Sequence, residues 1–198
     1  MQGINASRAF GKTIGVNTKL YSGLAKRTRS TSGYAQEGNK RKMKYVPRLR
    51  EELTTSALDK IKWLQIVKRE GSKEKATRLW LDGKVPADVV LPPKICADRI
   101  IKRKLKLAQK IVKKGKTKIV LENISHQENM QAVIERLTGR NSEDYLHGKP
   151  IMPLEKLTFK FDSAAPEKVT MLFRGIGIDV TERFWKVLTL KKEGSEIV

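Results

Sequence analysis

The stretch that decides the fold is ADVVLPPKICADRIIKRKLKLAQKIVKKGKTKIVLENISHQENMQAVIERLTG, residues 87–139. Its apolar residues change their spacing along the stretch, which predicts the order strand, helix, strand, helix. The first strand is a run of Val89, Val90 and Leu91 that two prolines close. The elements that follow are expected at 98–114 for the first helix, 117–123 for the second strand and 125–138 for the second helix.

The first helix of this stretch carries eight Lys and Arg and one acid, Asp98, which is its expected first residue. At a helical repeat it presents two stripes. The apolar stripe, expected to face a core, comprises Ile101, Leu105, Ala108 and Val112. The basic stripe comprises Arg99, Arg103, Lys106, Lys110 and Lys114. The basic stripe indicates either contact with phosphates or a solvated face, and the helix dipole explains only cations in the last turn.

The second helix has its own start and stop signals. Ser125 is expected as its N-cap, and Glu128 three residues later completes a capping-box pattern. Gly139 is expected to end the helix in the left-handed conformation that glycine adopts without strain.

Two alternating segments follow, and they complete the predicted fold. Residues 157–161 and 169–173 each alternate apolar and polar side chains, which is typical of half-buried strands. The expected class is therefore α+β, with two helices packed on a four-stranded mixed sheet in the order β-α-β-α-β-β. A helical hairpin is expected before this domain and a helix after it.

The sequence divides into four parts: a basic flexible arm at 1–50, a helical hairpin at 51–84, the α+β domain at 85–175 and a C-terminal helical extension at 176–198. The arm contains twelve Lys and Arg and one acid, Glu37. With so little apolar periodicity it is expected to be disordered alone. It resembles an organelle transit peptide at its start, a basic arm that orders on RNA, or a plain solvated tail.

The segments on either side of the domain each leave two interpretations open. In the hairpin, Trp63 and Trp80 are expected to pack, with base stacking as the alternative, and Ser72 is the expected N-cap of the second helix. In the extension, Val180, Phe184 and Leu188 share one helical face. This face is expected either to pack back on the domain or to dock onto a protein neighbour.

Composition restricts the class of partner. The net charge is +21 at pH 7 over 198 residues, and such a charge favours a polyanionic partner, most often nucleic acid. The main rival is a basic membrane-surface or scaffold module that binds anionic lipid. No apolar run approaches the length of a transmembrane helix. A single cysteine, Cys96, excludes a disulfide framework and is expected to be a small core residue.

The sequence carries no catalytic signature. The histidines are His126 and His147, and neither lies in a pattern with a Ser or Cys nucleophile. No glycine-rich phosphate loop is present, and RGIGID at 174–179 is expected to be a turn. We therefore expect a non-enzymatic protein with no cofactor, no metal and no small-molecule substrate.

The segment at about 87–174 resembles the C-terminal domain of bacterial-type and organellar translation initiation factor 3. The resemblance rests on VVLPPKI, on KLKLAQKIVKKGKTKIVL and on HQENMQAVIERL, with His126, Gln127, Val133, Ile134 and Arg136 at the family's positions. It implies a domain that binds ribosomal RNA. Two features depart from the family: the turn ENISHQ at 122–127 lacks the arginines with which the family contacts small-subunit RNA, and residues 1–84 hold no counterpart of its N-terminal domain.

Together, charge and resemblance predict a ribosomal-RNA-binding component of the mitochondrial translation apparatus, in the matrix, with another organelle or the cytoplasm as the alternative location. It is expected to be ribosome-bound beside neighbouring ribosomal proteins, or else a dissociable initiation factor on the small subunit. The candidate RNA-binding residues in and after the basic helix are Arg99, Lys102, Arg103, Lys106, Lys110, Lys113, Lys114, Lys116 and Lys118. Those in the arm are Arg27, Arg29, Lys40, Arg41, Lys42 and Lys44.

Overall fold

The structure is a computed structural model that describes most of the chain. The described residues are 2–13, 19–22, 26–39, 48–49, 57–112, 121–124, 126–149, 151, 155–161, 165 and 167–189. For residues 104–112 and for the strands at 19–22, 48–49 and 121–124, the description covers the backbone alone.

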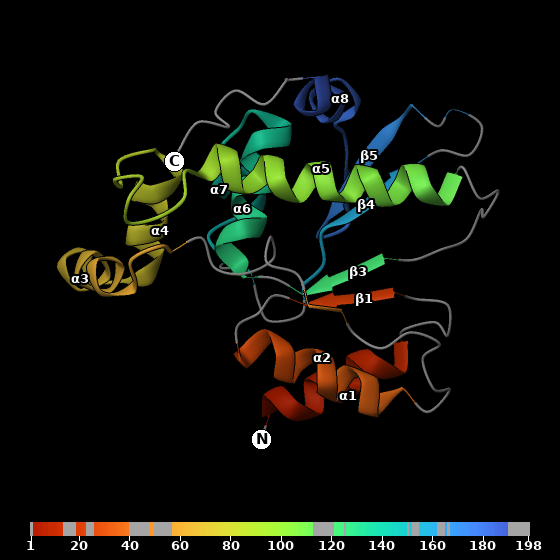
Figure 1. The fold of residues 1–198 in the computed structure, drawn as a ribbon, viewed down its shortest axis with the longest axis horizontal. Helices are drawn as coiled ribbons and strands as arrows, with labels where there is room; N and C mark the ends of the chain where they lie inside the picture. The colour runs from red at the N-terminus through yellow and green to blue at the C-terminus, as the bar shows by residue number, and fades with distance from the viewer. Residues whose placement is uncertain are drawn as a thin grey trace.

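An antiparallel sheet of three strands forms the C-terminal half of the core (Figure 1). Its strands, in the spatial order of the sheet, are β4 (Thr158–Phe161), β5 (Val169–Phe173) and β6 (Ile176–Asp179). A two-residue turn joins β5 to β6, with Arg174 at φ 49° and Gly175 at φ 79°. Positive φ at both positions is the type I′ geometry whose twist suits a hairpin. The turn expected in RGIGID is thus confirmed at its first two residues.

Helix α8 (Thr181–Thr189) covers the apolar face of this sheet. Phe184 is fully buried, and its ring lies 5.8 Å from that of Phe159 and 5.7 Å from that of Phe161, measured between ring centroids. Aromatic rings at such distances and tilts stabilise each other beyond the area they bury. The predicted face of Val180, Phe184 and Leu188 therefore packs on the core, and the docking alternative for this face is wrong.

Two helices pack together beside the sheet: α5 (Pro93–Val112) and α6 (Gln127–Thr138). Cys96, Ala97, Ile100 and Ile101 of α5 join Ala132, Val133, Ile134 and Leu137 of α6 in one buried cluster. Helix α6 confirms the second predicted helix, and Gly139 ends it at φ 69°. Its N-cap is His126 and not the predicted Ser125, which lies outside the described residues.

Helix α5 starts five residues earlier than predicted, at Pro93 and not at Asp98. Proline suits the first position of a helix because its missing N–H would have no partner there. The Cys96 N–H then donates to the Pro92 carbonyl oxygen at 3.0 Å. Of the predicted core stripe, Ile101 is fully buried, and the other three side chains lie outside the description.

Three short helices attach to this body. They are α3 (Lys60–Glu70), α4 (Lys73–Leu81) and α7 (Glu143–Leu146). Ser72 caps α4 through the Lys75 N–H, as predicted. Trp80 is 2% exposed and its indole N–H donates to the Leu91 carbonyl at 2.8 Å, so this side chain is a packing residue.

Two helices and two strands of a second sheet belong to the N-terminal segment, where a flexible arm was expected. The helices are α1 (Gln2–Thr13) and α2 (Lys26–Gly38), and the parallel strands are β1 (Lys19–Ser22), β2 (Arg48–Leu49) and β3 (Leu121–Ile124) in the order β2-β1-β3. The two helices touch closely, because a Cβ on Gly11 would collide with the Ala35 carbonyl. Figure 1 shows this pair at the opposite end of the molecule from α8.

The predicted four-stranded mixed sheet is wrong. Among the described residues, the strands divide between two three-stranded sheets, and β3 pairs in parallel with β1 and not with β4 or β5. The expected first strand forms a turn at 87–89 and a single bridge from Val90 to Ala57. Pro92 and Pro93 lack the N–H donors that a longer strand pairing requires, and Pro93 starts a helix instead.

Candidate nucleic-acid interface

The first turns of α5 carry the predicted cations whose side chains the structure describes. Arg99 is exposed, whereas Lys102 and Arg103 are half-buried. Lys94, which is not among the predicted cations, is also exposed and precedes Arg99 by five residues. The core side of α5 at this level is Cys96, Ala97, Ile100 and Ile101, so Arg103 lies at the edge of the buried face and Arg99 points away from it.

The one acid in the sequence of α5 is neutralised by α6. Asp98 accepts hydrogen bonds from Arg136 Nε at 2.7 Å and from Nη2 at 3.5 Å. Both side chains are largely shielded, at 16% and 22% exposure. Because charge-assisted pairs of this kind are strong and local, Asp98 does not offset the field of the exposed Arg99 beside it. On the part of α5 whose side chains are described, the exposed charged residues are therefore cations, Lys94 and Arg99.

The remaining predicted cations of this helix are only partly described. Lys106 and Lys110 belong to α5, at seven and eleven residues from Arg99, so the three occupy register positions on one side of the helix. Lys113, Lys114, Lys116 and Lys118 lie outside the described residues.

The candidate residues of the N-terminal arm fall in or after α2. Arg29 is exposed on α2, and Arg27 is part of the same helix, where its backbone alone is described. Lys40, Arg41, Lys42 and Lys44 lie outside the described residues. Arg8 of α1, in contrast, pairs with Glu37 of α2 at 3.0 Å and so belongs to the contact between the two helices.

Other cations of the body are committed to internal contacts. Arg78 of α4 bonds Glu135 of α6 at 2.6 Å, Asp82 and Asn141, and Glu135 also accepts from the Ser142 hydroxyl at 2.9 Å. Burial opposes the charge on Arg78, yet the hydrogen bonds that Arg78 donates to Glu135 and Asp82 outweigh it and raise the pKa of the guanidinium. This network fixes the α3–α4 hairpin against α6.

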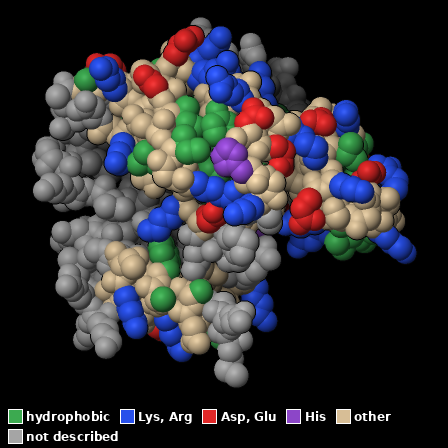
Figure 2. Space-filling view, turned by 180° about the vertical axis from the view of Figure 1, so that it is seen from behind, with side chains coloured by type: hydrophobic (Ala, Val, Ile, Leu, Met, Phe, Trp, Pro, Cys, Tyr) green, Lys and Arg blue, Asp and Glu red, His purple; other side chains and the backbone are tan. Residues whose placement is uncertain are grey.

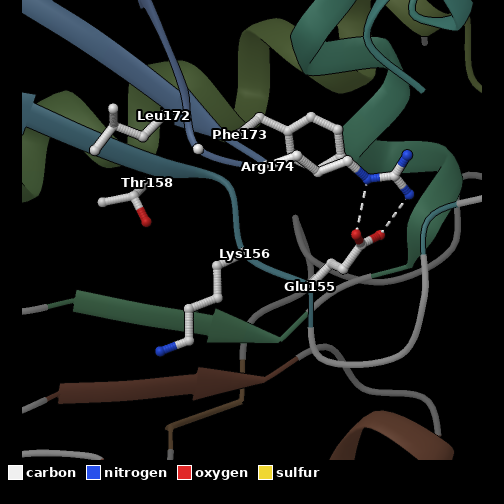
Figure 3. A pocket seen from close by; sticks show the side chains of 7 residues that line it. Glu155, Lys156, Thr158, Leu172, Phe173 and Arg174 are labelled. Atoms are coloured by element: carbon white, nitrogen blue, oxygen red, sulfur yellow. Dashed lines mark hydrogen bonds and ion pairs between the residues drawn. The ribbon is translucent and has the colours of Figure 1, made fainter. Parts of the chain in front are cut away.

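A hollow of about 470 Å³ lies beside the β5–β6 turn, lined by Glu155, Lys156, Thr158, Leu172, Phe173, Arg174 and Gly175 (Figure 3). Arg174 points to Glu155 and makes a bidentate pair with it at 2.8 and 2.9 Å. Its third nitrogen donates to the Leu146 carbonyl at 2.6 Å. Lys156 points the other way, toward β1 and β3, and its ammonium lies 4.7 Å from the Phe10 ring centroid.

Arg174 is therefore a structural residue, because its donors hold the loop before β4 against the hairpin turn. The hydrogen bonds that Arg174 donates to Glu155 raise the pKa of Arg174, which keeps this contact charged. The hollow is a poor phosphate site, because the Arg174 guanidinium is already bonded to the Glu155 carboxylate.

The face of the molecule that is hidden in Figure 1 carries both positive and negative side chains. Figure 2 shows Lys and Arg interspersed with Asp and Glu over the described part of that face, with no single basic patch. Among the residues that the structure describes, no group of His, Cys, Asp and Glu could hold a metal ion, and no helix is long and apolar enough to cross a membrane. Cys96 is buried, as predicted, and lies 3.2 Å from the Asn129 amide oxygen.

Comparison with known proteins adds a likeness of fold. No family model matches the chain, and no curated protein matches it in sequence. Among solved structures, YhfR of Bacillus stearothermophilus is similar, with a TM-score of 0.53 and 16% sequence identity over 87% of this chain and 81% of YhfR. At this identity the likeness concerns the fold alone, and it does not bear on the resemblance to initiation factor 3.

Proposed function

We propose that this protein binds ribosomal RNA as a resident component of the mitochondrial translation apparatus. The observation that carries the proposal is the surplus of positive charge: the net charge is +21, and the exposed side of α5 keeps its cations while its one acid is neutralised by Arg136. The proposal makes no use of the four-stranded sheet. It rests on charge and on the sequence resemblance at 87–174.

The binding mode follows from the kind of contact. Lys and Arg side chains on α5 meet phosphate oxygens, which position a protein on RNA without reading its sequence. Recognition then depends on the shape of a folded RNA, because protein side chains do not enter the narrow major groove of an RNA helix. Cations of α2 and of the segments on either side of it add further phosphate contacts.

The direct test is a substitution of three cations at register positions on one side of α5. Replacing Arg99, Lys106 and Lys110 with Gln removes three phosphate contacts, so the slope of log K against log salt falls by about two to three. The matched control replaces three exposed cations elsewhere, Lys75, Arg140 and Lys149, with the same change in net charge. Equal loss of RNA affinity in both variants would remove α5 from the interface and leave only general charge.

A sedimentation experiment separates the resident protein from a dissociable initiation factor. A resident ribosomal protein stays with its subunit in a high-salt sucrose gradient, because many phosphate contacts act together. Release at moderate salt would favour the factor. Flotation of the protein with anionic vesicles in the absence of RNA, together with failure to sediment with ribosomes, would favour the lipid-binding alternative.

The mitochondrial location rests on the first fifty residues, with twelve Lys and Arg against one acid. Fractionation of cells that express the full chain with a C-terminal tag tests it. Recovery of the tagged protein in the matrix with mitochondrial ribosomes is the expected result, and recovery with cytoplasmic ribosomes would contradict it.

A further inference from the structure

Helix α3 exposes a cluster of apolar side chains to solvent. Leu58, Ile61 and Leu64, which we call the α3 patch, are 63%, 72% and 64% exposed. The other exposed large apolar side chains of the described residues, Ile95 and Ile176, are 43% and 39% exposed and stand apart in the sequence. Three large apolar side chains exposed within seven residues mark an interaction site more often than single exposed residues do.

The α3 patch is not a by-product of a helix that packs badly. Trp63 and Ile66 of the same helix face the protein and pack against the core. Ile61 and Leu64 are three residues apart, so they lie on one face of α3, on the outer side. Figure 1 shows α3 at the edge of the molecule, joined to the body through α4. Helix α3 therefore has two apolar faces, and the protein itself covers one of them.

Two exposed cations flank the α3 patch. Lys60 and Lys68 are exposed, and within the described residues neither side chain forms an ion pair. The acids that begin and end α3 are occupied by neighbouring cations: Asp59 caps the helix and lies 3.9 Å from Lys62, and Glu70 lies 2.9 Å from Arg69. The patch is thus an apolar surface flanked by two ammonium groups that form no ion pair with any residue the structure describes.

We propose that the α3 patch docks an acidic amphipathic segment of another protein. Such a segment supplies apolar side chains for Leu58, Ile61 and Leu64 and carboxylates for Lys60 and Lys68. Docking at the α3 patch does not depend on the proposed function.

Other occupants fit less well. A second copy would bring the same lysines face to face, on chains that each carry a net charge of +21. A helix that lies on an anionic membrane sets its aromatic and aliphatic residues on one face, whereas α3 turns Trp63 toward the core and away from the patch. The bases of RNA stack best on aromatic side chains, and the α3 patch has none.

A photoreactive amino acid placed at Gln65, an exposed position on α3, tests the proposal in cells that express the full chain. The expected product is a crosslink to a peptide of another protein that is rich in Asp, Glu and apolar residues. The crosslinking yield should fall about tenfold in the double variant Ile61→Ser/Leu64→Ser, which corresponds to a loss of about 1.4 kcal/mol of binding free energy. It should fall several-fold in the double variant Lys60→Glu/Lys68→Glu. Ile176→Ser is the matched control and leaves the yield unchanged.

Because Ile61 and Leu64 are more than 60% exposed, their replacement leaves the fold intact, and an unchanged thermal midpoint verifies this. Crosslinks to RNA, to lipid or to a second copy alone would overturn the proposal. Absence of any crosslink, or a protein crosslink that the double substitutions leave unchanged, would overturn it as well. Sedimentation with ribosomes is measured in the same variants, so a failure of RNA binding is seen separately.

Discussion

Helices α5 and α6 pack against each other in one core, yet their charged residues have different roles. In α6, seven of twelve residues are buried, and Glu128, Glu135 and Arg136 each bond a partner on another element. In α5, the one acid is bonded to Arg136, and the exposed Arg99 is one of a series of cations along the helix. Charge in α6 therefore serves stability, and surplus charge in α5 is available to a partner.

This difference separates two properties that are often coupled. Substitutions in α6 should change the free energy of unfolding and leave the salt dependence of RNA binding intact. Substitutions on the outer side of α5 should do the reverse, because exposed charges contribute little to stability. The following predictions test that separation, from the largest expected effect to the smallest.

Ile134→Ala should have the largest effect. Ile134 is fully buried in α6 between α5 and the rest of the core, so truncation leaves a cavity and lowers the free energy of unfolding by about 3 kcal/mol. Urea denaturation measures this loss. Ile134→Val, which removes one methylene, should cost about 1 kcal/mol. Equal stability of the Ala variant and the native protein would show that α6 is not part of the core.

Glu135→Gln should have the second largest effect on stability. It removes the charge that Arg78 bonds at 2.6 Å and weakens the acceptor of Ser142, so we expect a loss of about 2 kcal/mol. The control Glu143→Gln changes an exposed carboxylate and should stay within about 0.5 kcal/mol of the native protein. A comparable loss in the two variants would mean that the network adds nothing specific.

Asp98→Asn examines the boundary between the two helices. It leaves the shielded Arg136 without a charged partner, so stability should fall by about 1 kcal/mol. RNA affinity should not fall, because the substitution makes the α5 surface more positive. Filter binding at several salt concentrations measures the affinity. Weaker RNA binding in the folded variant would contradict a phosphate-binding role for this side of α5.

Gly139→Ala addresses the end of α6. Gly139 adopts φ 69°, and an added Cβ would also press on the Arg183 guanidinium, the movable end of a long side chain. The cost should be about 1 kcal/mol, the penalty of a side chain in the left-handed region. Thermal unfolding measures it, and a gain in stability would contradict the observed cap.

The smallest effect concerns pH. The hydrogen bond from Arg78 lowers the pKa of Asp82 below its ordinary 3.8. A lowered carboxyl pKa contributes stability that is present above 3.8 and is lost as pH falls through the lower folded value. Stability of Asp82→Asn should therefore fall less steeply with acid below this pH than that of the native protein. Identical slopes in acid denaturation would exclude the contribution.

Local patterns in the sequence were sufficient to predict several helices and strands. The alternation at 157–161 and 169–173 predicted two strands, and the period of 3.6 in HQENMQAVIERL together with Gly139 predicted α6 and its end. Such patterns depend on which face of an element is buried, and that information lies within a few residues. The basic character of α5 and its exposed Arg99 were likewise accessible from spacing.

Long-range pairings were not accessible in this way. Strand β3 pairs with β1, which lies about a hundred residues earlier in the sequence, and no local pattern in either strand predicts this pairing. The N-terminal helices were missed because their contact uses Gly11, Ala35 and Gly38, which give no apolar periodicity. The α3 patch was also missed, since Ile61 and Leu64 belong to the same helical pattern as the buried Trp63 and Ile66.

The sequence by itself determined the charge of this protein, the place of its basic helix and the strands and helix that follow from strict periodicity. These depend on composition and on interactions within a single element. Only the tertiary structure decided that the strands form two sheets, that α5 begins at Pro93 and that Arg136 neutralises Asp98. Each of these depends on which distant segment supplies a hydrogen-bond partner or a buried surface, and that choice is made by the folded chain as a whole.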